Sequence, residues 1–391
     1  MPSAKRKMQS LLERGRSFLT PTGSSANFQG TAGFTKASTE TALFPKPDPA
    51  VDGEECLHDC SSCSVHYPAK FSIDEDDKLY GHVNGWDTHL IVGTGKTDWV
   101  RDVADEKGSV MQAVGKHGQE IEMSNGRGKG KMMLSASNMP SGGEHGDCDI
   151  ETGSDCMLLP SWTFIEKVRP EQVPALMSTI VATSASNRTL LSSSSIANDS
   201  TTTPETYDSA ADTPNGNGSS TPVELPTPTA QPVLKMPQFT TRPIPHRALI
   251  LMCSHKTRDA RCGQSAPLLR KEFERILRPM GLHRDLHDAR PGGVGIYFIN
   301  HVGGHKYSAN IMVYRRAGSK QTKAVTSGAG NGNTEEEETL QDEAVQGIWL
   351  ARVKPEDCEN IVRYTVLQGK VVKPGTQLRG GFDRERGLAS W

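Results

Sequence analysis

Two cysteines and two histidines stand in two closely spaced pairs in the C-terminal half of the chain. Eight residues separate Cys253 from Cys262, and three separate His301 from His305. Thiolate sulfur and imidazole nitrogen are ligands of zinc and of iron–sulfur clusters. Structural zinc usually pairs cysteines about two to four residues apart, so this spacing suits a cluster better but leaves zinc open. The other interpretation is two structural cysteines and two loop histidines.

The flanking sequence predicts the elements that carry these residues. The apolar run 248–252 indicates a buried strand, so Cys253 lies at a strand end. Helical periodicity over 265–277 places Cys262 on the loop before a helix. Both histidines lie on the turn between two further predicted strands, residues 295–299 and 309–314.

The residues around both pairs resemble a known family. Residues 253–263 read Cys-Ser-His-Lys-Thr-Arg-Asp-Ala-Arg-Cys-Gly, and residues 300–310 read Asn-His-Val-Gly-Gly-His-Lys-Tyr-Ser-Ala-Asn. Both stretches are similar to the sucrase/ferredoxin-like family and, within it, to the fungal actin-patches-distal proteins. The resemblance covers residues 245–316, resumes at 347–353 and is weaker over 50–180.

This resemblance implies a function and a ligand set. Those proteins are thioredoxin-like ferredoxins, so the chain is expected to carry one 2Fe–2S cluster. Cys253 and Cys262 would bind one iron, and His301 and His305 the other. His255 is not a ligand in the family pattern, and we expect a loop residue or one that supports the ligands. The family name also points to actin-patch organisation and redox-stress tolerance.

The mixed ligand set has electrochemical consequences. Two neutral imidazoles in place of two thiolates remove about two negative charges, which should raise the reduction potential above that of an all-cysteine ferredoxin. A ligating imidazole keeps one ring N–H whose acidity depends on the iron oxidation state, so electron transfer should be coupled to proton transfer. We therefore expect an electron carrier rather than an enzyme with its own substrate. The sequence does not indicate its electron donor or acceptor.

Charged and small residues surround the predicted ligands. Arg258, Asp259 and Arg261 lie between the cysteines, where they either tune the cluster and present a docking surface or pair with each other to hold the loop. Gly303 and Gly304 lie between the histidines, allow unusual backbone angles and let a bulky partner approach.

Two other functions stay open. One is a thiol-dependent oxidoreductase on a thioredoxin scaffold, although neither half has a Cys-x-x-Cys after its main strand. The other is a zinc-stabilised interaction module acting on the cortical actin system.

The chain contains an internal repeat. Residues 90–97, Leu-Ile-Val-Gly-Thr-Gly-Lys-Thr, align with residues 250–257, Ile-Leu-Met-Cys-Ser-His-Lys-Thr. Each half reads strand, helix, strand, strand, helix, which predicts an α/β fold of two thioredoxin-like domains. Gly93 stands where the second copy has Cys253, and the first copy has no counterpart of the histidine turn. The N-terminal copy is therefore expected to be degenerate and free of a cluster.

Composition divides the chain into five segments. They are a disordered basic tail at 1–48, the degenerate domain at 49–183, a disordered Ser/Thr/Pro linker at 184–243, the cluster-binding domain at 244–378 with an acidic insertion at 318–343, and a C-terminal tail at 379–391.

A further cysteine cluster precedes the first repeat. Cys60 and Cys63 form a Cys-x-x-Cys close to Cys56. This pair suits zinc, with His58 or His66 as the nearest further ligand, or a redox dithiol. The remaining interpretation is exposed thiols in a loop.

Charge and hydropathy exclude several classes of partner. The 391-residue chain has a formal net charge of -2, which gives no reason to expect nucleic-acid binding. It has no run of about 18 apolar residues, so no membrane span is expected. The basic N-terminus is compatible with a mitochondrial transit peptide, but the similar family members are cytosolic, so we expect a cytoplasmic protein.

Trp391 is the last residue of the polar stretch that begins at Arg379. A large aromatic ring in such a tail suits capture by a partner. It resembles the C-terminal tryptophan by which iron–sulfur clients are recognised by the cytosolic targeting machinery. We therefore expect Trp391 to recruit that machinery; the alternative is that the ring folds back onto its own domain.

Overall fold

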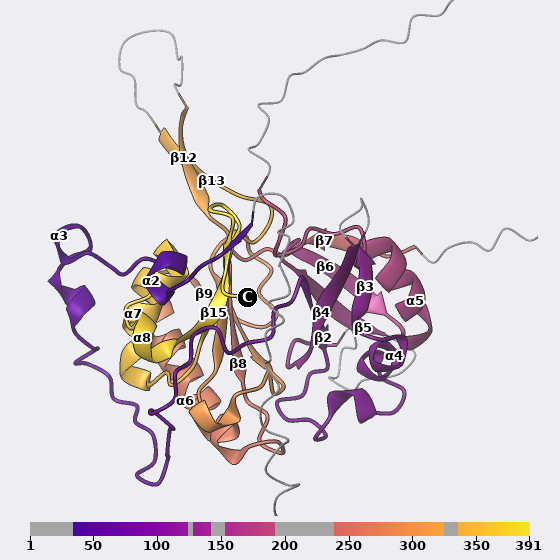
Figure 1. The fold of residues 1–391 in the computed structure, drawn as a ribbon, viewed down its shortest axis with the longest axis horizontal. Coiled ribbons are helices and arrows are strands. Elements are labelled where there is room, and N and C mark those ends of the chain that lie inside the picture. Colours follow the sequence, from indigo (N-terminus) through magenta and orange to yellow (C-terminus); the bar gives the residue numbers. More distant parts are fainter. Residues whose placement is uncertain (1–33, 124–127, 142–152, 192–237, 324–334) are drawn as a thin grey trace, which may run out of the picture. The chain divides into compact units, whose positions relative to one another are not determined.

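The computed structural model describes residues 34–123, 128–141, 153–191, 238–323 and 335–391, and Figure 1 shows how their helices and strands are arranged. The N-terminal half follows one order of elements. It runs β2 (Thr88–Gly93), a 3-10 turn (Val103–Asp105), α4 (Val110–His117), β3 (Glu120–Met123), β4 (Gly128–Ser137), β5 (Ser154–Leu159), β6 (Thr163–Val168), a 3-10 turn (Pro170–Gln172), α5 (Val173–Ala175) and a π-helical turn (Leu176–Val181).

The C-terminal half repeats that order. It runs β8 (Ala248–Cys253), α6 (Ala260–Leu277), β9 (His283–Arg284), β10 (Val294–Ile299), a 3-10 turn (His305–Tyr307), β11 (Ile311–Arg315), β14 (Gln346–Leu350), a 3-10 turn (Pro355–Asp357), α7 (Cys358–Asn360) and a π-helical turn (Ile361–Val366). Both halves contain two strands more than the sequence pattern predicts, β3 and β6 in the first half and β9 and β14 in the second.

Further elements flank the two halves. They are β1 (Thr35–Lys36), α2 (Glu40–Leu43), α3 (Pro49–Asp52), a 3-10 turn (Glu54–Leu57), β7 (Thr241–Pro243), β12 (Gly318–Lys323), β13 (Glu335–Leu340), α8 (Pro374–Gln377), β15 (Leu378–Asp383) and β16 (Leu388–Ala389). Among the described residues, no helix is both long enough and apolar enough to cross a membrane.

A single mixed sheet joins the two halves. Its path is β1-β16-β15-β14-β11-β8-β10-β4-β2-β5-β6-β7, with β3 on β4 and β9 on β10. The order β14-β11-β8-β10 mirrors the order β6-β5-β2-β4, and in each half the first two strands are parallel while the others are antiparallel. The equivalent strands β10 and β4 meet antiparallel, with Ile299 opposite Ser137. The repeat therefore forms a mixed α/β fold around a pseudo-twofold contact.

Two asparagines fix this central contact. The N–H of Phe298 donates to Asn138 Oδ1 over 2.7 Å, and the N–H of Ala136 donates to Asn300 Oδ1 over 2.9 Å. Each asparagine directly follows the last residue of its own strand. Because both amides occupy equivalent positions, Asn138 is the N-terminal counterpart of Asn300, which immediately precedes His301.

The two faces of the sheet are covered by separate apolar clusters. Along β8, Ile250 and Met252 belong to the cluster that includes Phe273 of α6. Leu249 and Leu251 belong to the cluster on the other face. A strand buried on both faces carries an uninterrupted apolar run rather than an alternating one, which is why 248–252 was recognisable as a strand.

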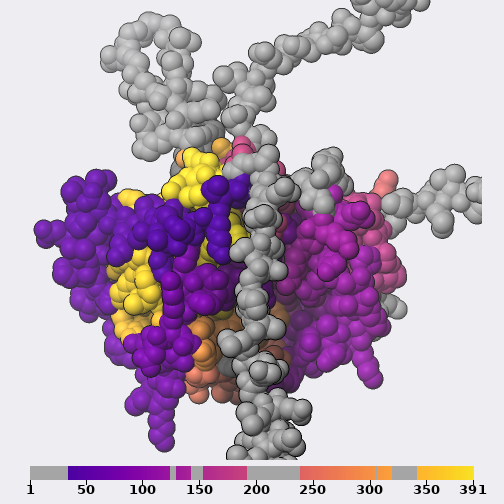
Figure 2. Space-filling view, in the orientation of Figure 1, coloured from indigo at the N-terminus to yellow at the C-terminus, as the bar shows by residue number. Residues whose placement is uncertain are grey.

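The expected N-terminal tail is shorter than predicted. Residues 34–48 include β1, which pairs with β16, and α2, whose N-cap is Thr39. Figure 2 shows this indigo segment lying over the yellow C-terminal elements. The helix forms because Thr39 Oγ1 accepts from the N–H of Ala42, and Leu43 is fully buried. Residues 1–33 lie outside the described part of the chain.

The predicted linker is shorter at both ends. The backbone N–H of Asn187 donates to Asp87 O over 2.7 Å, and its amide donates to Trp86 O over 3.0 Å. At the other end, β7 extends the sheet beside β6. Residues 192–237 of the expected linker lie outside the described part.

The acidic insertion is not a plain loop in its described portions. β12 and β13 pair antiparallel from Gly318 with Leu340 to Lys323 with Glu335. Its centre, residues 324–334, is not among the described residues.

The predicted mobile C-terminal tail belongs to the sheet. β15 pairs with β14, and β16 pairs with β15. The ring of Trp391 lies 4.5 Å from that of Trp86 and 6.4 Å from that of Phe382, measured between centroids. Residues 379–391 are therefore not a free tail, because Phe382 is fully buried and Ala389 is also buried.

A buried polar network links the halves and predicts a pH dependence. His89 contacts Tyr314 Oη at 3.0 Å and Ser135 Oγ at 2.8 Å, and burial lowers its pKa from 6.5 to about 3. Below about pH 6.5, His89 therefore binds a proton in the unfolded chain but stays neutral in the folded chain. We expect the free energy of unfolding to fall by about 1.4 kcal/mol per pH unit between pH 6 and pH 4 from this group.

Urea unfolding at several pH values measures this slope. His246, whose pKa burial lowers to about 4, contributes a further part of it. The variant His89→Gln should show a distinctly shallower slope, whatever its absolute stability. An identical slope in the variant and the parent would contradict the assignment.

Candidate metal centre

Cys253 lies at the centre of the sheet. It is the last residue of β8, which runs between β10 and β11. Its N–H donates to Asn310 O over 3.1 Å, and the residue is 2 % exposed. The sequence correctly placed this cysteine at a strand end.

Cys262 lies in the first turn of α6, not on the loop before it. Asp259 caps the helix by accepting from the N–H of Arg261 over 2.9 Å, so the helix begins at Ala260. The apolar periodicity starts only at Ser265, which is why the pattern missed the first turn. A thiol in this turn faces the positive end of the helix dipole.

The charged residues between the cysteines hold the loop. Arg261 Nη2 donates to Asp259 Oδ2 over 2.9 Å, and its Nη1 donates to Lys306 O over 3.3 Å. Arg258 Nη1 donates to Arg101 O over 3.3 Å. The sequence left two interpretations open for these residues. The structure shows the second one, in which Asp259 pairs with Arg261.

The histidine turn follows β10. His301 is half-buried, and its Nδ1 lies 3.8 Å from Cys253 Sγ. The backbone of His305 opens the 3-10 turn His305–Tyr307. The side chain of His305 lies outside the described residues, so its expected role as a ligand stays a prediction.

Three of the four predicted ligands converge. The ligand atoms of Cys253, Cys262 and His301 all lie within 4.8 Å of one another. The hydrogen bond from Cys262, opposed by burial and assisted by His301, lowers the pKa of Cys253 to about 5. The hydrogen bond to Cys253, and then burial, raise the pKa of Cys262. A metal cation at this position would favour both thiolates, and the donor set suits zinc or an iron–sulfur centre.

Most of the chain matches a known protein family. The profile of the sucrase/ferredoxin-like family matches residues 79–380. The chain belongs to the sucrase/ferredoxin-like family. No solved structure gives a significant match to it.

Among curated relatives, the chain is 26% identical to Actin patches distal protein 1 of Saccharomyces cerevisiae over 343 residues, which cover 84% of this chain and 85% of that protein. It is 33% identical to Altered inheritance of mitochondria protein 32 of Clavispora lusitaniae over 135 residues, 34% of this chain and 36% of that protein. It is also 33% identical to the protein of that name from Debaryomyces hansenii over 125 residues, 32% of this chain and 33% of that protein.

His255 joins the histidine turn to the N-terminal half of the chain. Its Nδ1 accepts from the N–H of His301 over 3.2 Å, and its Nε2 contacts Trp99 O at 3.0 Å. The Nε2 therefore carries the ring proton, since a backbone carbonyl only accepts. Ser254 Oγ also donates to the same N-terminal loop, at Thr97 O over 2.7 Å. The N-terminal half thus holds the ligand loop of the C-terminal half.

Arg379 is a site residue that the sequence did not reveal. Its Nη1 donates to Gly303 O over 2.9 Å and to Asn310 Oδ1 over 2.8 Å. Gly304 has a φ of 70°, and a Cβ there would lie 2.6 Å from the Arg379 guanidinium. Glycine is therefore required at 304 for this arginine to approach, and burial lowers the pKa of Arg379 to about 10. The expected mobility of the segment from 379 onward concealed its role.

Replacing Arg379 should loosen the site. Arg379→Met keeps much of the side-chain length but removes the hydrogen bonds to Gly303 O in the histidine turn and to Asn310 Oδ1. We expect metal to be lost about tenfold faster under chelator challenge, because supporting hydrogen bonds typically contribute 10–100-fold to metal affinity. The matched control is Arg242→Met, which breaks the exposed pair with Glu166 far from the site. Equal retention by both variants would contradict the role of Arg379.

The N-terminal half has other residues at the described positions that are equivalent to Cys253 and His301. Gly93 ends β2 as Cys253 ends β8, and Met139 follows Asn138 as His301 follows Asn300. A Cβ at Gly93 would lie 3.0 Å from Asp155 O and 3.1 Å from Met139 Cε. Met139 therefore lies beside Gly93 in the way that His301 lies beside Cys253.

A cavity of about 420 Å³ adjoins His301. Apart from the histidine turn, it is lined by both halves of the chain, including Trp86 and Lys131 from one and Trp349 and Arg379 from the other. None of the described residues that line it is acidic. It provides access to the site for a neutral or anionic group.

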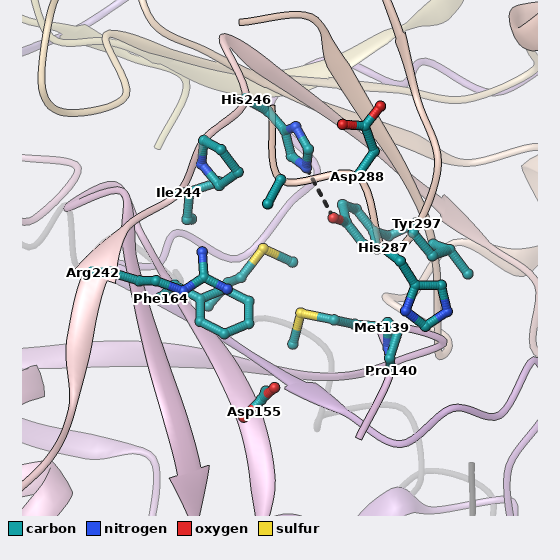
Figure 3. Close-up of a pocket in the computed structure, with 14 residues that line it drawn as sticks. Met139, Pro140, Asp155, Phe164, Arg242, Ile244, His246, His287, Asp288 and Tyr297 are labelled. Carbon is teal, nitrogen blue, oxygen red and sulfur yellow. Dashed lines mark hydrogen bonds between the residues drawn. The ribbon is translucent and has the colours of Figure 1, made fainter. Parts of the chain in front are cut away.

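A separate cavity of about 220 Å³ lies away from the metal ligands (Figure 3). Arg242 lies over the Phe164 ring at 3.9 Å, and His246 Nε2 contacts Tyr297 Oη at 3.1 Å. None of the three converging residues lines this cavity. The cavity is therefore not part of the Cys/His site.

Proposed function

We propose that this protein is an electron carrier that holds one 2Fe–2S cluster through Cys253, Cys262, His301 and His305. The observation that carries the proposal is the convergence of two sulfurs and one imidazole nitrogen within 4.8 Å, at the junction of two strand ends and a helix N-terminus. Such a cluster supplies reversible one-electron transfer.

The chain's own residues prepare the site for that role. β8 and α6 place the two thiols, and Asp259 fixes the first turn of α6. His255 and Arg379 hold the backbone of the histidine turn from two sides. Because these groups sit on a rigid sheet and helix, little movement is needed when the charge of the site changes.

Proton transfer is proposed to accompany electron transfer. His301 is half-buried and lines the cavity that both halves form. An imidazole ligand keeps one ring N–H, and a position at the cavity lets that proton exchange with solvent. The lack of acids around the cavity favours an acceptor or donor without positive charge.

The cellular role is proposed from relatives. The relative that covers most of the chain is named for actin patches, which supports a role in actin-patch organisation and a cytoplasmic location. A role in redox-stress tolerance is proposed with them from the family resemblance alone. The shorter matches are named for inheritance of mitochondria, which keeps a mitochondrial location as the alternative.

Each half is proposed to be a thioredoxin-like unit. Both contain a strand-helix-strand unit with parallel strands followed by antiparallel strands and a helix. The N-terminal unit is then a structural partner that carries no cluster, since Gly93 and Met139 replace two of the ligands.

Recruitment of cytosolic cluster-delivery proteins through Trp391 stays a proposal. The ring packs against Trp86, so recruitment would require release of β16 from the sheet. If Trp391→Ala lowers thermal stability and leaves iron occupancy unchanged in cells, the residue is structural. Lower occupancy with unchanged stability would support recruitment.

An absorption spectrum with metal analysis tests the proposed function. Freshly purified protein should be red-brown, with two iron atoms and two labile sulfides per chain, and should bleach reversibly on reduction. A colourless protein with one zinc and no sulfide would instead identify a zinc-stabilised interaction module, the alternative that the same donor set allows.

A further inference from the structure

The Cys-x-x-Cys at Cys60 and Cys63 lies in a segment that contacts α6 through Arg275 and α7 through Asn360. The N–H of Cys60 donates to Glu356 O over 3.0 Å, and Asn360 Nδ2 donates to His58 O over 2.9 Å. Lys373 Nζ lies 2.7 Å from Asp59 Oδ1. The pair is therefore part of the folded structure rather than a free loop.

The backbone geometry allows the two thiols to bond. Ser61 and Ser62 form a turn, so Cys60 and Cys63 occupy its two ends. The ends of a β-turn lie within about 7 Å, and disulfides span Cα separations of about 4.4–6.8 Å. A bond between these cysteines needs little movement of the main chain.

Cys60 has the surroundings of an attacking thiol. It is half-buried and lines an open cavity of about 450 Å³. Arg275 Nη2 lies 3.6 Å from its Sγ. The thiolate is the nucleophilic form of cysteine, and this guanidinium offers it a counter-charge.

Cys63 has the surroundings of a second, protonated thiol. It does not line that cavity, and its Sγ lies 3.3 Å from Val65 O. Burial, together with the carboxylate of Glu272, raises its pKa. Such a thiol needs a base before it can attack.

Glu272 offers that base. Its side chain is fully buried, and its Oε1 accepts from Arg275 Nη2 over 2.6 Å. Its Oε2 has no hydrogen-bond partner in the described part of the chain. A buried carboxylate oxygen without a donor is costly and calls for a functional reason; an incoming proton from Cys63 supplies the missing donor.

We propose that Cys60 and Cys63 form a dithiol site that reduces cationic disulfides, with Glu272 as the proton acceptor for Cys63. The Cys60 thiolate attacks one sulfur of the substrate, its S–S bond breaks, and one thiolate leaves. Cys63 then gives its proton to Glu272 Oε2 while its sulfur attacks Cys60 Sγ, which forms the Cys60–Cys63 bond and expels the second thiolate. Two electrons pass from the dithiol to the substrate.

The charge of the cavity sets the substrate class. Its lining includes four acids and one arginine: Glu54, Glu55, Asp59, Glu359 and Arg363. A surface with this excess of negative charge attracts cationic disulfides and repels anionic ones, and salt screens the effect.

This site is independent of the metal centre. Cys262 and Arg275 lie thirteen positions apart in α6, which corresponds to about 20 Å along the helix. The described part of the chain brings no third metal-ligating atom to Cys60 and Cys63 within the range found at Cys253, which favours a dithiol over zinc.

The test uses the full-length protein, reduced and freed of reductant, with cystamine and oxidised glutathione as the cationic and anionic probes. Mass spectrometry follows the mixed disulfide and the Cys60–Cys63 bond. We expect cystamine to react at least about tenfold faster at low salt, with the difference shrinking at high salt. Cys63→Ser should stop at the mixed disulfide on Cys60, and Cys60→Ser should form neither product.

Glu272→Gln separates the base from a structural role. It should slow closure of the Cys60–Cys63 bond about tenfold near neutral pH and accumulate the mixed disulfide, while at high pH Cys63 ionises unaided and the rate should recover. Cys358→Ala is the matched control, because Cys358 is fully buried nearby and should be dispensable.

Three results would overturn the proposal: a bond from Cys63 to Cys358, bound zinc that is lost in Cys60→Ser and Cys63→Ser, or equal rates with both probes at low salt. None of them bears on the metal centre at Cys253.

Discussion

Cys253→Ala should leave the purified protein without bound iron, with a visible spectrum at the level of the apoprotein. The residue supplies a sulfur at the centre of the converging group and is buried at the end of β8. Cys262→Ala should have the same effect. Iron content per chain, measured by mass spectrometry of the metal, should fall by at least about tenfold, since solvent cannot replace the lost thiolate in a buried site.

Cys156→Ala provides the matched control. Cys156 is also fully buried, but it lies in β5 of the N-terminal half. Iron should stay bound in this variant. Normal iron content after loss of Cys253, with the circular dichroism spectrum unchanged, would remove the ligand assignment.

Trp86→Ala should lower the free energy of unfolding by about 3–5 kcal/mol. The indole is 1 % exposed and donates from Nε1 to Tyr314 Oη over 3.2 Å. It stands edge-on to Trp349 at 5.7 Å between centroids and lies tilted against Trp391. The substitution removes an N-terminal ring from a cluster built mostly by the C-terminal half, so a single urea transition should shift as a whole.

An exposed apolar residue sets the baseline for this measurement. Leu57→Ala, at a side chain that is 65% exposed, should change the free energy of unfolding by no more than about 0.5 kcal/mol. Two separate transitions in Trp86→Ala, with the C-terminal one unshifted, would mean that the halves fold independently.

The sequence predicted the convergence of Cys253, Cys262 and His301 better than it predicted the fold around them. Cys253 could be placed because 248–252 is an apolar run, and strands buried on both faces produce such runs. The helix start at Ala260 escaped because it depends on the Asp259 cap and not on periodicity. Gly93 was recognised as a missing cysteine because the repeat supplies an internal alignment.

Other features depend on contacts far apart in the chain. Arg379 reaches Gly303 across 76 positions, and no local pattern marks a single arginine as buried. The pairing of β4 with β10 is also a contact between the two halves. The internal repeat shows that the halves are alike, but it does not show which strands meet. The packing of Trp391 on Trp86 also joins residues far apart in the sequence, so the local sequence around Trp391 does not reveal it.

Pulsed electron paramagnetic resonance on the reduced protein tests the central claim most directly. Protein labelled with ¹⁵N-histidine should give a half-integer-spin signal with strong coupling to imidazole nitrogen, and the coupling should change in His301→Cys and in His305→Cys. A cluster signal without any nitrogen coupling, or fully metallated protein that never becomes paramagnetic on reduction, would contradict a 2Fe–2S cluster held by two cysteines and two histidines.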